Sequence, residues 1–335
     1  MKLLKSMLVL MIVAVLCFAM IGCAPKAEEQ PSASEAAPET SEAAPETSEA
    51  APEKTFRLGI SLHLTKSEYG RLMYDGYEAA CADLGVEYEI VDADNDVTNQ
   101  IGQVETLITN QVDGILITPV DVDAAVPAIE KAKEAGIPVV AVNTIPNTDI
   151  IDSYVGSDDV EVGRNITDWM AEQLGEEGGK VVVLQGHLGM SSEVQRTQGI
   201  EEALANHPQI EVLAMETADW MRDMGMDLME NWLTSFGDEI DGVIAENDEM
   251  GIGAMQAVVA ANLDKKIYII GVDGLQDAKV AIQDGTYDCT YFQDAAGQTR
   301  GGVEAMLKIL KGESVDKETW IPFVKIDASN VADFM

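Results

Sequence analysis

From residue 55 onward, short apolar runs alternate along the chain with longer segments in which apolar positions recur at helical spacing. After about residue 160 the same rhythm restarts and continues almost to the C-terminus. Strands and helices that alternate in this way predict parallel sheets covered by helices on both faces. The predicted strands are 56–61, 86–91, 114–118, 138–142, 154–156, 180–185, 210–215, 242–245, 267–272 and 288–292. The predicted helices are 69–84, 99–110, 124–135, 160–174, 191–206, 221–235, 249–261 and 274–284.

The predicted strands can form one large sheet or two smaller ones, and two sheets of about five strands suit the chain length better. In such sheets, ligands bind beyond the carboxyl ends of the strands. Polar side chains that directly follow a strand are therefore the candidates for a binding site. They lie at 63–69, 143–144, 186–187, 247–248, 273–274 and 293–294.

The first residues have the pattern of an export signal. Two lysines precede an apolar run over 8–21 that is too short to predict a membrane span. The run ends in Met-Ile-Gly-Cys at 20–23, which resembles a bacterial lipobox with Met where Leu is usual. We expect 1–23 to be a lipoprotein signal peptide and Cys23 to carry the lipid anchor. An ordinary signal peptide cleaved near this point is the alternative.

Residues 24–54 have the composition of a tether. Pro, Glu, Ser and Ala dominate, and Ser-Glu-Ala-Ala-Pro-Glu-Thr occurs at 34–40 and again at 41–47. Because no apolar residue larger than alanine is present, the segment cannot bury enough surface to offset its ordering entropy. We predict a disordered acidic tether that holds the folded part away from the membrane.

The charge of the chain excludes several classes of partner. Its 335 residues include 59 acidic and 21 basic ones, which gives a formal net charge of −38. A nucleic-acid binder needs a basic surface, and anionic lipids repel an acidic protein. We therefore expect no nucleic-acid partner, and contact with the membrane only through the lipid. Cys81 and Cys289 are predicted to be buried core residues without a disulfide.

Several segments near the strand ends follow a characteristic order and spacing. They read VDGILITP at 112–119, AGIPVV at 135–140, VGSD at 155–158, AENDEMGIGA at 245–254 and IGVDG at 270–274. Together they resemble the ribose- and galactose-type (type I) periplasmic sugar-binding proteins of ABC importers, in lipoprotein form. The resemblance covers about residues 55 to 325, which is nearly the whole of the predicted folded part.

The resemblance implies an α/β fold of two Rossmann-like lobes with parallel sheets, joined by a three-strand hinge. The first lobe would comprise 55–157 and a helix over 294–320. The second lobe would comprise 158–293 and 321–335. The ligand would bind in the cleft between the lobes. The chain would cross from lobe to lobe near 157–158, 293–294 and 321–322.

The resemblance also places ligand contacts on the second lobe. Sugar hydroxyls both donate and accept hydrogen bonds, so carboxylate, amide and guanidinium groups bind them, and an aromatic ring covers a C–H face. Arg196 matches the family arginine and Trp220 the stacking aromatic, with a surface arginine and a core tryptophan as the alternatives. Asn247 and Asp273 match the amide and the carboxylate, with helix capping as the alternative. Gln293 matches a contact near the hinge.

The first lobe departs from the family pattern. After the first strand the family has an Asn and one or two aromatics, whereas here Tyr69 is the single aromatic residue that can stack on a ligand. Asn143 and Thr144 replace the family's Asp-Arg pair, which places ribose itself in doubt and leaves Asn143 as a candidate contact. His63 and Glu68 can reach a ligand, but exposed loop positions are the favoured interpretation.

Other patterns do not support a metal, cofactor or catalytic site. Asp92, Asp94 and Asp96 resemble the start of a calcium loop, but the glycine and glutamate that the loop needs are missing, so a helix-capping turn is predicted. The methionines over 221–229 are predicted to fill the core. Phosphate-binding and nucleophile–base patterns are not found in the sequence, so we expect no cofactor, no metal and no enzymatic activity.

These observations predict a monomeric solute-binding protein that captures a small neutral sugar or polyol for an ABC permease and ATPase. It would lie at the outer face of the cytoplasmic membrane, which is periplasmic where an outer membrane exists. A receptor that delivers a sugar or a furanosyl signal molecule to a membrane sensor is the alternative. A sugar-responsive repressor shares this fold but would need a DNA-binding unit where this chain has an export signal.

Overall fold

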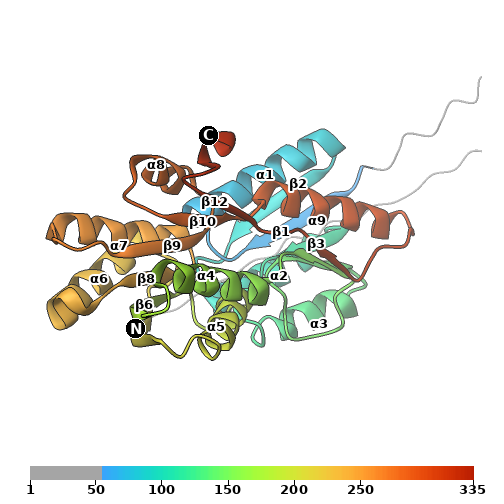
Figure 1. Cartoon of the computed structure of the whole chain (residues 1–335). Helices are drawn as coiled ribbons and strands as arrows, with labels where there is room; N and C mark the ends of the chain where they lie inside the picture. Colours follow the sequence, from blue (N-terminus) through green and yellow to red (C-terminus); the bar gives the residue numbers. More distant parts are fainter. Residues whose placement is uncertain (1–54) are drawn as a thin grey trace, which may run out of the picture. The chain divides into compact units, whose positions relative to one another are not determined.

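Residues 55–335, which the computed structural model describes, contain two six-stranded sheets with helices packed against them (Figure 1). The predicted signal peptide, Cys23 and the predicted tether lie outside the described residues. Within 55–335, no helix combines the length and the apolar character that crossing a membrane requires.

The first sheet is parallel throughout, and its central strands are buried. Its strands are β1 (Arg57–Leu62), β2 (Glu87–Asp92), β3 (Gly114–Ile117), β4 (Val139–Asn143), β5 (Ser153–Gly156) and β11 (Glu318–Trp320), in the order β11-β5-β4-β3-β1-β2. The helices that pack on it are α1 (Glu68–Leu84), α2 (Val97–Thr109), α3 (Val126–Glu134) and α9 (Ala295–Leu310).

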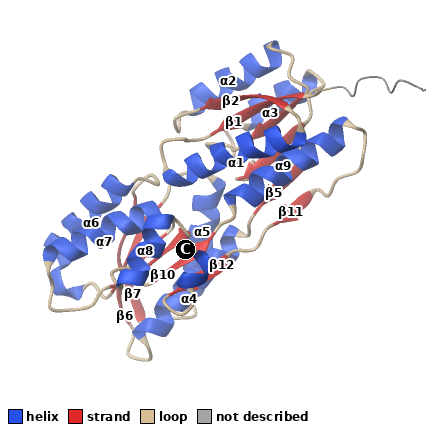
Figure 2. Cartoon of the chain, turned by 90° about the horizontal axis from the view of Figure 1, so that it is seen from above, coloured by secondary structure: helices blue, strands red, loops and turns tan. Residues whose placement is uncertain are grey.

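The second sheet repeats this plan with one antiparallel edge. Its strands are β6 (Gly179–Gln185), β7 (Ile210–Thr217), β8 (Gly242–Ala245), β9 (Tyr268–Asp273), β10 (Cys289–Phe292) and β12 (Val324–Asp327), in the order β12-β10-β9-β8-β6-β7. Its helices are α4 (Asp159–Leu174), α5 (Ser191–Leu204), α6 (Arg222–Phe236), α7 (Asp248–Ala261) and α8 (Gln276–Asp284), with short 3-10 helices at Gly237–Glu239 and Val331–Phe334. Figure 2 shows the two lobes as separate groups, with α2 and α3 at one end and α6 and α7 at the other.

The chain crosses between the two sheets three times. β5 leads into α4 through 157–158, β10 leads into α9 through 293–294, and β11 leads into β12 through 321–323. As a result, α9 packs on β3, β4 and β5 of the first sheet although the strand before it belongs to the second. The predicted α/β fold, with two lobes of mostly parallel strands and three connections, is confirmed.

The C-terminal part differs from the prediction in two ways. Instead of a helix that continues to residue 320, α9 ends at Leu310, Gly312 turns the chain with a φ of 75°, and β11 pairs with β5. The sequence pattern did not reveal β11 because this strand is only 3 residues long and all of them are exposed. The strand β12 pairs with β10 in the antiparallel sense. Because β11 joins the first sheet and β12 joins the second, each sheet has six strands rather than five.

Close packing between α4 and α5 fixes the position of Arg196. A Cβ on Gly163 of α4 would lie 2.3 Å from the carbonyl oxygen of Arg196, and a Cβ on Gly199 of α5 would lie 2.2 Å from that of Val160. Only glycine allows the two backbones to come this close. The contact brings Arg196 beside Asp159, the first residue of α4.

Candidate ligand-binding site

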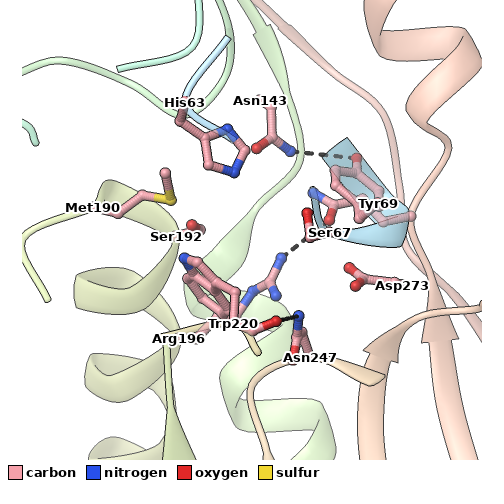
Figure 3. Close-up of a pocket in the computed structure, with 11 residues that line it drawn as sticks. His63, Ser67, Tyr69, Asn143, Met190, Ser192, Arg196, Trp220, Asn247 and Asp273 are labelled. Atoms are coloured by element: carbon pink, nitrogen blue, oxygen red, sulfur yellow. Dashed lines mark hydrogen bonds between the residues drawn. The ribbon is translucent and has the colours of Figure 1, made fainter. Parts of the chain in front are cut away.

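A pocket lies between the two lobes, at the carboxyl ends of strands from both sheets (Figure 3). It holds about 340 Å³ of empty space, part of which is open to solvent. All seven residues predicted to contact ligand line this pocket. The complete lining is His63, Ser67, Tyr69, Asn143, Met190, Ser192, Arg196, Trp220, Asn247, Asp273 and Gln293.

Arg196 is a buried anchor of the second lobe. It projects from α5, its side chain is 3 % exposed, and its Nε donates a hydrogen bond to Asp159 Oδ1 at 2.8 Å. One Nη group donates to the carbonyl oxygen of Glu246, and the other donates to Gln293 Oε1 at 3.1 Å. Burial raises the pKa of Asp159 to about 6, while Arg196 opposes that rise. These contacts hold the guanidinium group in one orientation at the pocket wall.

Asp273 lines the pocket with a carboxyl group that lacks one of its hydrogen-bond partners within the chain. It is the last residue of β9, it has a φ of 124°, and Gly274 follows with a φ of 70°. Its Oδ2 is buried without a hydrogen-bond partner. Burial raises the pKa of this carboxyl well above its usual value, and the charge of Arg196 works in the opposite direction. A hydroxyl group at this point would give Oδ2 the missing partner.

Trp220 and Asn247 support each other on the same side of the pocket. Trp220 has a φ of 66° and its ring packs on Gly186, where a Cβ would lie 2.0 Å from the ring. Asn247 caps α7, since its Oδ1 accepts from Met250 N at 3.0 Å, and its Nδ2 donates to Trp220 O at 3.4 Å. Asn247 thus has the capping role and also lines the pocket, so the two interpretations of this residue are compatible.

The first lobe contributes a neutral hydrogen-bond network. Asn143 Nδ2 donates to Gln298 Oε1 at 3.0 Å and to the Tyr69 hydroxyl at 3.3 Å, and that hydroxyl donates to Gln298 Oε1 at 3.2 Å. Gln298 Nε2 in turn donates to Ser157 Oγ at 2.8 Å, at a crossing between the lobes. Gln298 lies in α9 and carried no signal in the sequence, because its position depends on the crossing at 293–294.

The prediction that His63 is an exposed loop residue was wrong. Its side chain is buried and lines the pocket, whereas Glu68 does not line it and lies 3.8 Å from Arg222. The sequence did show that His63 directly follows a strand, which is where site residues were expected. Ser67, Met190 and Ser192 also line the pocket and were not predicted.

Four pocket-lining side chains have a buried polar atom without a partner in the chain. The atoms are His63 Nδ1, Trp220 Nε1, Asp273 Oδ2 and Gln293 Nε2. They include donors and an acceptor, and unpaired buried atoms each cost about 1–3 kcal/mol. A molecule with several hydroxyl groups can pair with all of these atoms, because a hydroxyl donates and accepts. Figure 3 shows His63, Asn143 and Tyr69 across the pocket from Arg196, Trp220 and Asn247.

Two other predictions have mixed outcomes in the described part of the chain. Asp96 caps α2 through a hydrogen bond from Asn99 N at 3.0 Å, as the predicted capping turn requires. Met229 is buried, but Met224 is 39 % exposed, so the methionines of α6 do not all fill the core.

Among residues 55–335, His, Cys, Asp and Glu form no group of three or more that could hold a metal ion. The two cysteines, Cys81 and Cys289, are buried and free.

Comparison with known proteins gives consistent matches. The model of a periplasmic binding protein domain matches residues 58–314. A protein of Rhizobium meliloti named for rhizopine binding is 39 % identical over 285 residues, which are 83 % of this chain and 92 % of that protein. A xylitol-binding protein of Mycolicibacterium smegmatis is 40 % identical over 239 residues, 71 % of this chain and 68 % of that protein.

A solved structure of a solute-binding protein also matches this chain. The ABC transporter solute-binding protein of Bacillus halodurans, with bound myo-inositol, superposes with a TM-score of 0.79 and 33 % identity. The match covers 85 % of this chain and 99 % of that one.

Proposed function

Because the chain belongs to the periplasmic binding protein family, we propose that it captures a neutral monosaccharide or related polyol outside the cytoplasm and delivers it to an ABC importer. Family membership makes it a solute-binding protein and not an enzyme, as predicted. A xylitol-binding relative and a neighbour with bound myo-inositol support a ligand with several hydroxyl groups.

The observation that carries the ligand class is the set of unpaired polar atoms in the pocket. Four side chains from both lobes each keep one buried atom without a partner: His63, Trp220, Asp273 and Gln293. Arg196 already has Asp159 as its counterion, so the pocket does not present an isolated positive charge to an anionic ligand. The arrangement favours a neutral ligand whose hydroxyls pair with these atoms.

Each predicted contact then has a specific role. Arg196 and Gln293 donate to ligand oxygens, Asp273 accepts from a hydroxyl, and Asn247 contacts the rim from the start of α7. Trp220 covers a C–H face of the ligand from the second lobe. Tyr69 and Asn143 close the pocket from the first lobe through their network with Gln298.

Closure of the lobes couples binding to transport in this proposal. The three connections at 157–158, 293–294 and 321–323 allow the lobes to rotate as rigid bodies about a hinge. A ligand that contacts both lobes shifts the population toward the closed form. The permease then recognises one closed molecule of the binding protein, which acts as a monomer.

We also propose that Cys23 carries a lipid that holds the protein at the outer face of the cytoplasmic membrane. The lipobox-like residues 20–23 and the acidic spacer that follows support this assignment. In the producing cell, Cys23→Ser releases the protein from the membrane fraction, whereas Cys17→Ser, within the signal, leaves it there. Retention of the Cys23 variant at the membrane would exclude a lipid on this residue.

A ligand panel tests the proposed function. Isothermal titration calorimetry on the purified protein measures binding of D-ribose, xylitol, myo-inositol and other pentoses, hexoses and polyols. At least one of these compounds binds, and the same compound raises the melting temperature, since a ligand at a hundredfold excess over its Kd adds about 2.7 kcal/mol of stability. If all of them fail while an anionic solute or an amino acid binds, the proposed ligand class is wrong.

A further inference from the structure

His63 occupies the strand end of the first lobe that faces the pocket. It directly follows β1, and its carbonyl oxygen accepts a hydrogen bond from Asn95 N at 2.8 Å. The strand and this hydrogen bond hold the backbone in place, and the buried imidazole lines the pocket beside Asn143 (Figure 3). The position of the ring is therefore set by the fold and not by a mobile loop.

Nδ1 of this imidazole has no hydrogen-bond partner in the chain. An unpaired polar atom in a buried position destabilises the folded protein, and a leucine or phenylalanine would fill the same space without that cost. The neighbouring first-lobe groups differ, because Asn143 Nδ2 and the Tyr69 hydroxyl both bind Gln298. A fixed, unpaired nitrogen of His63 thus lies buried in the first-lobe wall of the pocket.

The imidazole is neutral at pH 7. Burial lowers the pKa of His63 to about 4, although nearby Asp92 favours the charged form. A neutral imidazole carries one N–H and one bare nitrogen, so Nδ1 can either donate to a hydroxyl or accept from it. His63, Ser67, Tyr69 and Asn143 give the first lobe an uncharged lining, while the charged Arg196 and the acidic Asp273 come from the second lobe.

We propose that His63 determines which ligands this protein accepts, through a hydrogen bond between Nδ1 and one ligand hydroxyl that faces the first lobe. This inference rests on the proposed function and deepens it. The polar groups of the second lobe anchor any polyol of suitable size. A ligand that lacks the hydroxyl opposite His63, or carries it in the other orientation, leaves Nδ1 unpaired and is rejected.

A cycle between protein variants and ligand analogues tests this role. The probe is the tightest binder among D-ribose, xylitol and myo-inositol, together with its monodeoxy analogues, and calorimetry gives each Kd. The variants are His63→Phe, which keeps a ring without Nδ1, and His63→Asn, which keeps a polar atom near the Nδ1 position. His207→Asn is the matched control, because His207 lies outside the pocket and pairs with Asp168.

We expect His63→Phe to weaken binding of the parent ligand about tenfold. For one monodeoxy analogue, the wild type loses about the same factor and His63→Phe loses nothing further. His63→Asn keeps the wild-type preference, and the His207 variant matches the wild type throughout. If His63→Phe does not fold, His63→Gln replaces it, since the longer amide moves its polar atoms away from the Nδ1 position and should abolish the preference that His63→Asn retains.

Equal weakening of every analogue by the His63 variants would show that the ring only packs, and unchanged affinities would show that it does not touch the ligand. Either result overturns the assignment of His63 and leaves the proposed function standing. Absence of binding by the wild-type protein to all three parent compounds would instead contradict the proposed function, and this inference with it.

Discussion

The side chains of the pocket divide into two chemical groups according to their lobe. The second lobe supplies the ion pair of Arg196 with Asp159 and the incompletely paired carboxyl of Asp273. The first lobe supplies the neutral groups of His63, Tyr69 and Asn143. Groups that are buried at a stability cost and aimed into a pocket are typical of binding sites, because the ligand restores their hydrogen bonds.

Asp273→Asn should weaken ligand binding and stabilise the ligand-free protein. Loss of a carboxyl acceptor for a ligand hydroxyl reduces affinity about 10- to 100-fold, as expected for about 1.5–3 kcal/mol. At the same time, the substitution removes a buried carboxyl whose pKa is raised by burial, so the free energy of unfolding without ligand rises. Calorimetry and urea denaturation measure the two effects.

The control is Asp284→Asn, an exposed residue at the end of α8 that should change neither quantity. Unchanged affinity in the Asp273 variant would remove this residue from the site.

Glu246→Gln should become progressively more stable than the wild type as the pH rises. Glu246 is fully buried, its Oε2 accepts from Gly186 N at 2.8 Å, and burial raises its pKa from 4.5 to about 8. Between those values the folded state keeps a proton that the unfolded state has lost, so the wild type loses about 1.4 kcal/mol of stability per pH unit and the Gln variant does not. Urea denaturation of both proteins at pH 5, 6.5 and 8 gives the difference. A difference that stays constant with pH would mean that Glu246 is ionised in the folded state.

Among the elements, α5 determines the position of Arg196, because it carries this residue and approaches the backbone of α4 closely at two glycines. The contact depends on Gly163 and Gly199, each of which lies against the backbone of the opposite helix. Overpacking at such a contact costs about 1–3 kcal/mol and moves the helix. The position of the guanidinium group thus depends on two glycines that do not line the pocket.

Gly199→Ala should lower both stability and ligand affinity, since the new methyl group would overlap the carbonyl oxygen of Val160. We expect a loss of about 1–3 kcal/mol in the free energy of unfolding. The matched control is Gly102→Ala in α2, where a Cβ meets no atom within 4 Å, and the higher helix propensity of alanine should stabilise the protein by up to about 1 kcal/mol. If both variants behave alike, the α4–α5 contact does not control Arg196.

The sequence predicted the repeating elements well because long apolar runs and helical spacing are local signals. It also placed Asn247, Asp273 and Gln293 near one another, since each lies at or directly after the carboxyl end of a parallel strand. Arg196 was predicted from the family resemblance alone. It missed β11, whose three exposed residues carry no apolar pattern. It misjudged His63 because burial in a cleft depends on residues that are distant in the sequence.

At the scale of the whole described part, hydrogen bonds join the lobes on two sides of the pocket. Val122 N of the first lobe donates to Gly189 O at 3.0 Å, and Ile145 N donates to Ser191 Oγ at 2.8 Å. Near α1, Glu68 N donates to Glu249 Oε1 at 3.3 Å. We therefore expect ligand entry to involve rotation about the three connections, and a bound ligand to add its own contacts to both lobes.

The most direct measurement is a crystal structure of the protein with the tightest ligand of the panel. We predict density for one ligand between the lobes, with oxygen atoms about 3 Å from Asp273 Oδ2, Gln293 Nε2 and His63 Nδ1. A ligand bound outside this pocket, or held by one lobe alone with those three atoms still unpaired, would contradict the account.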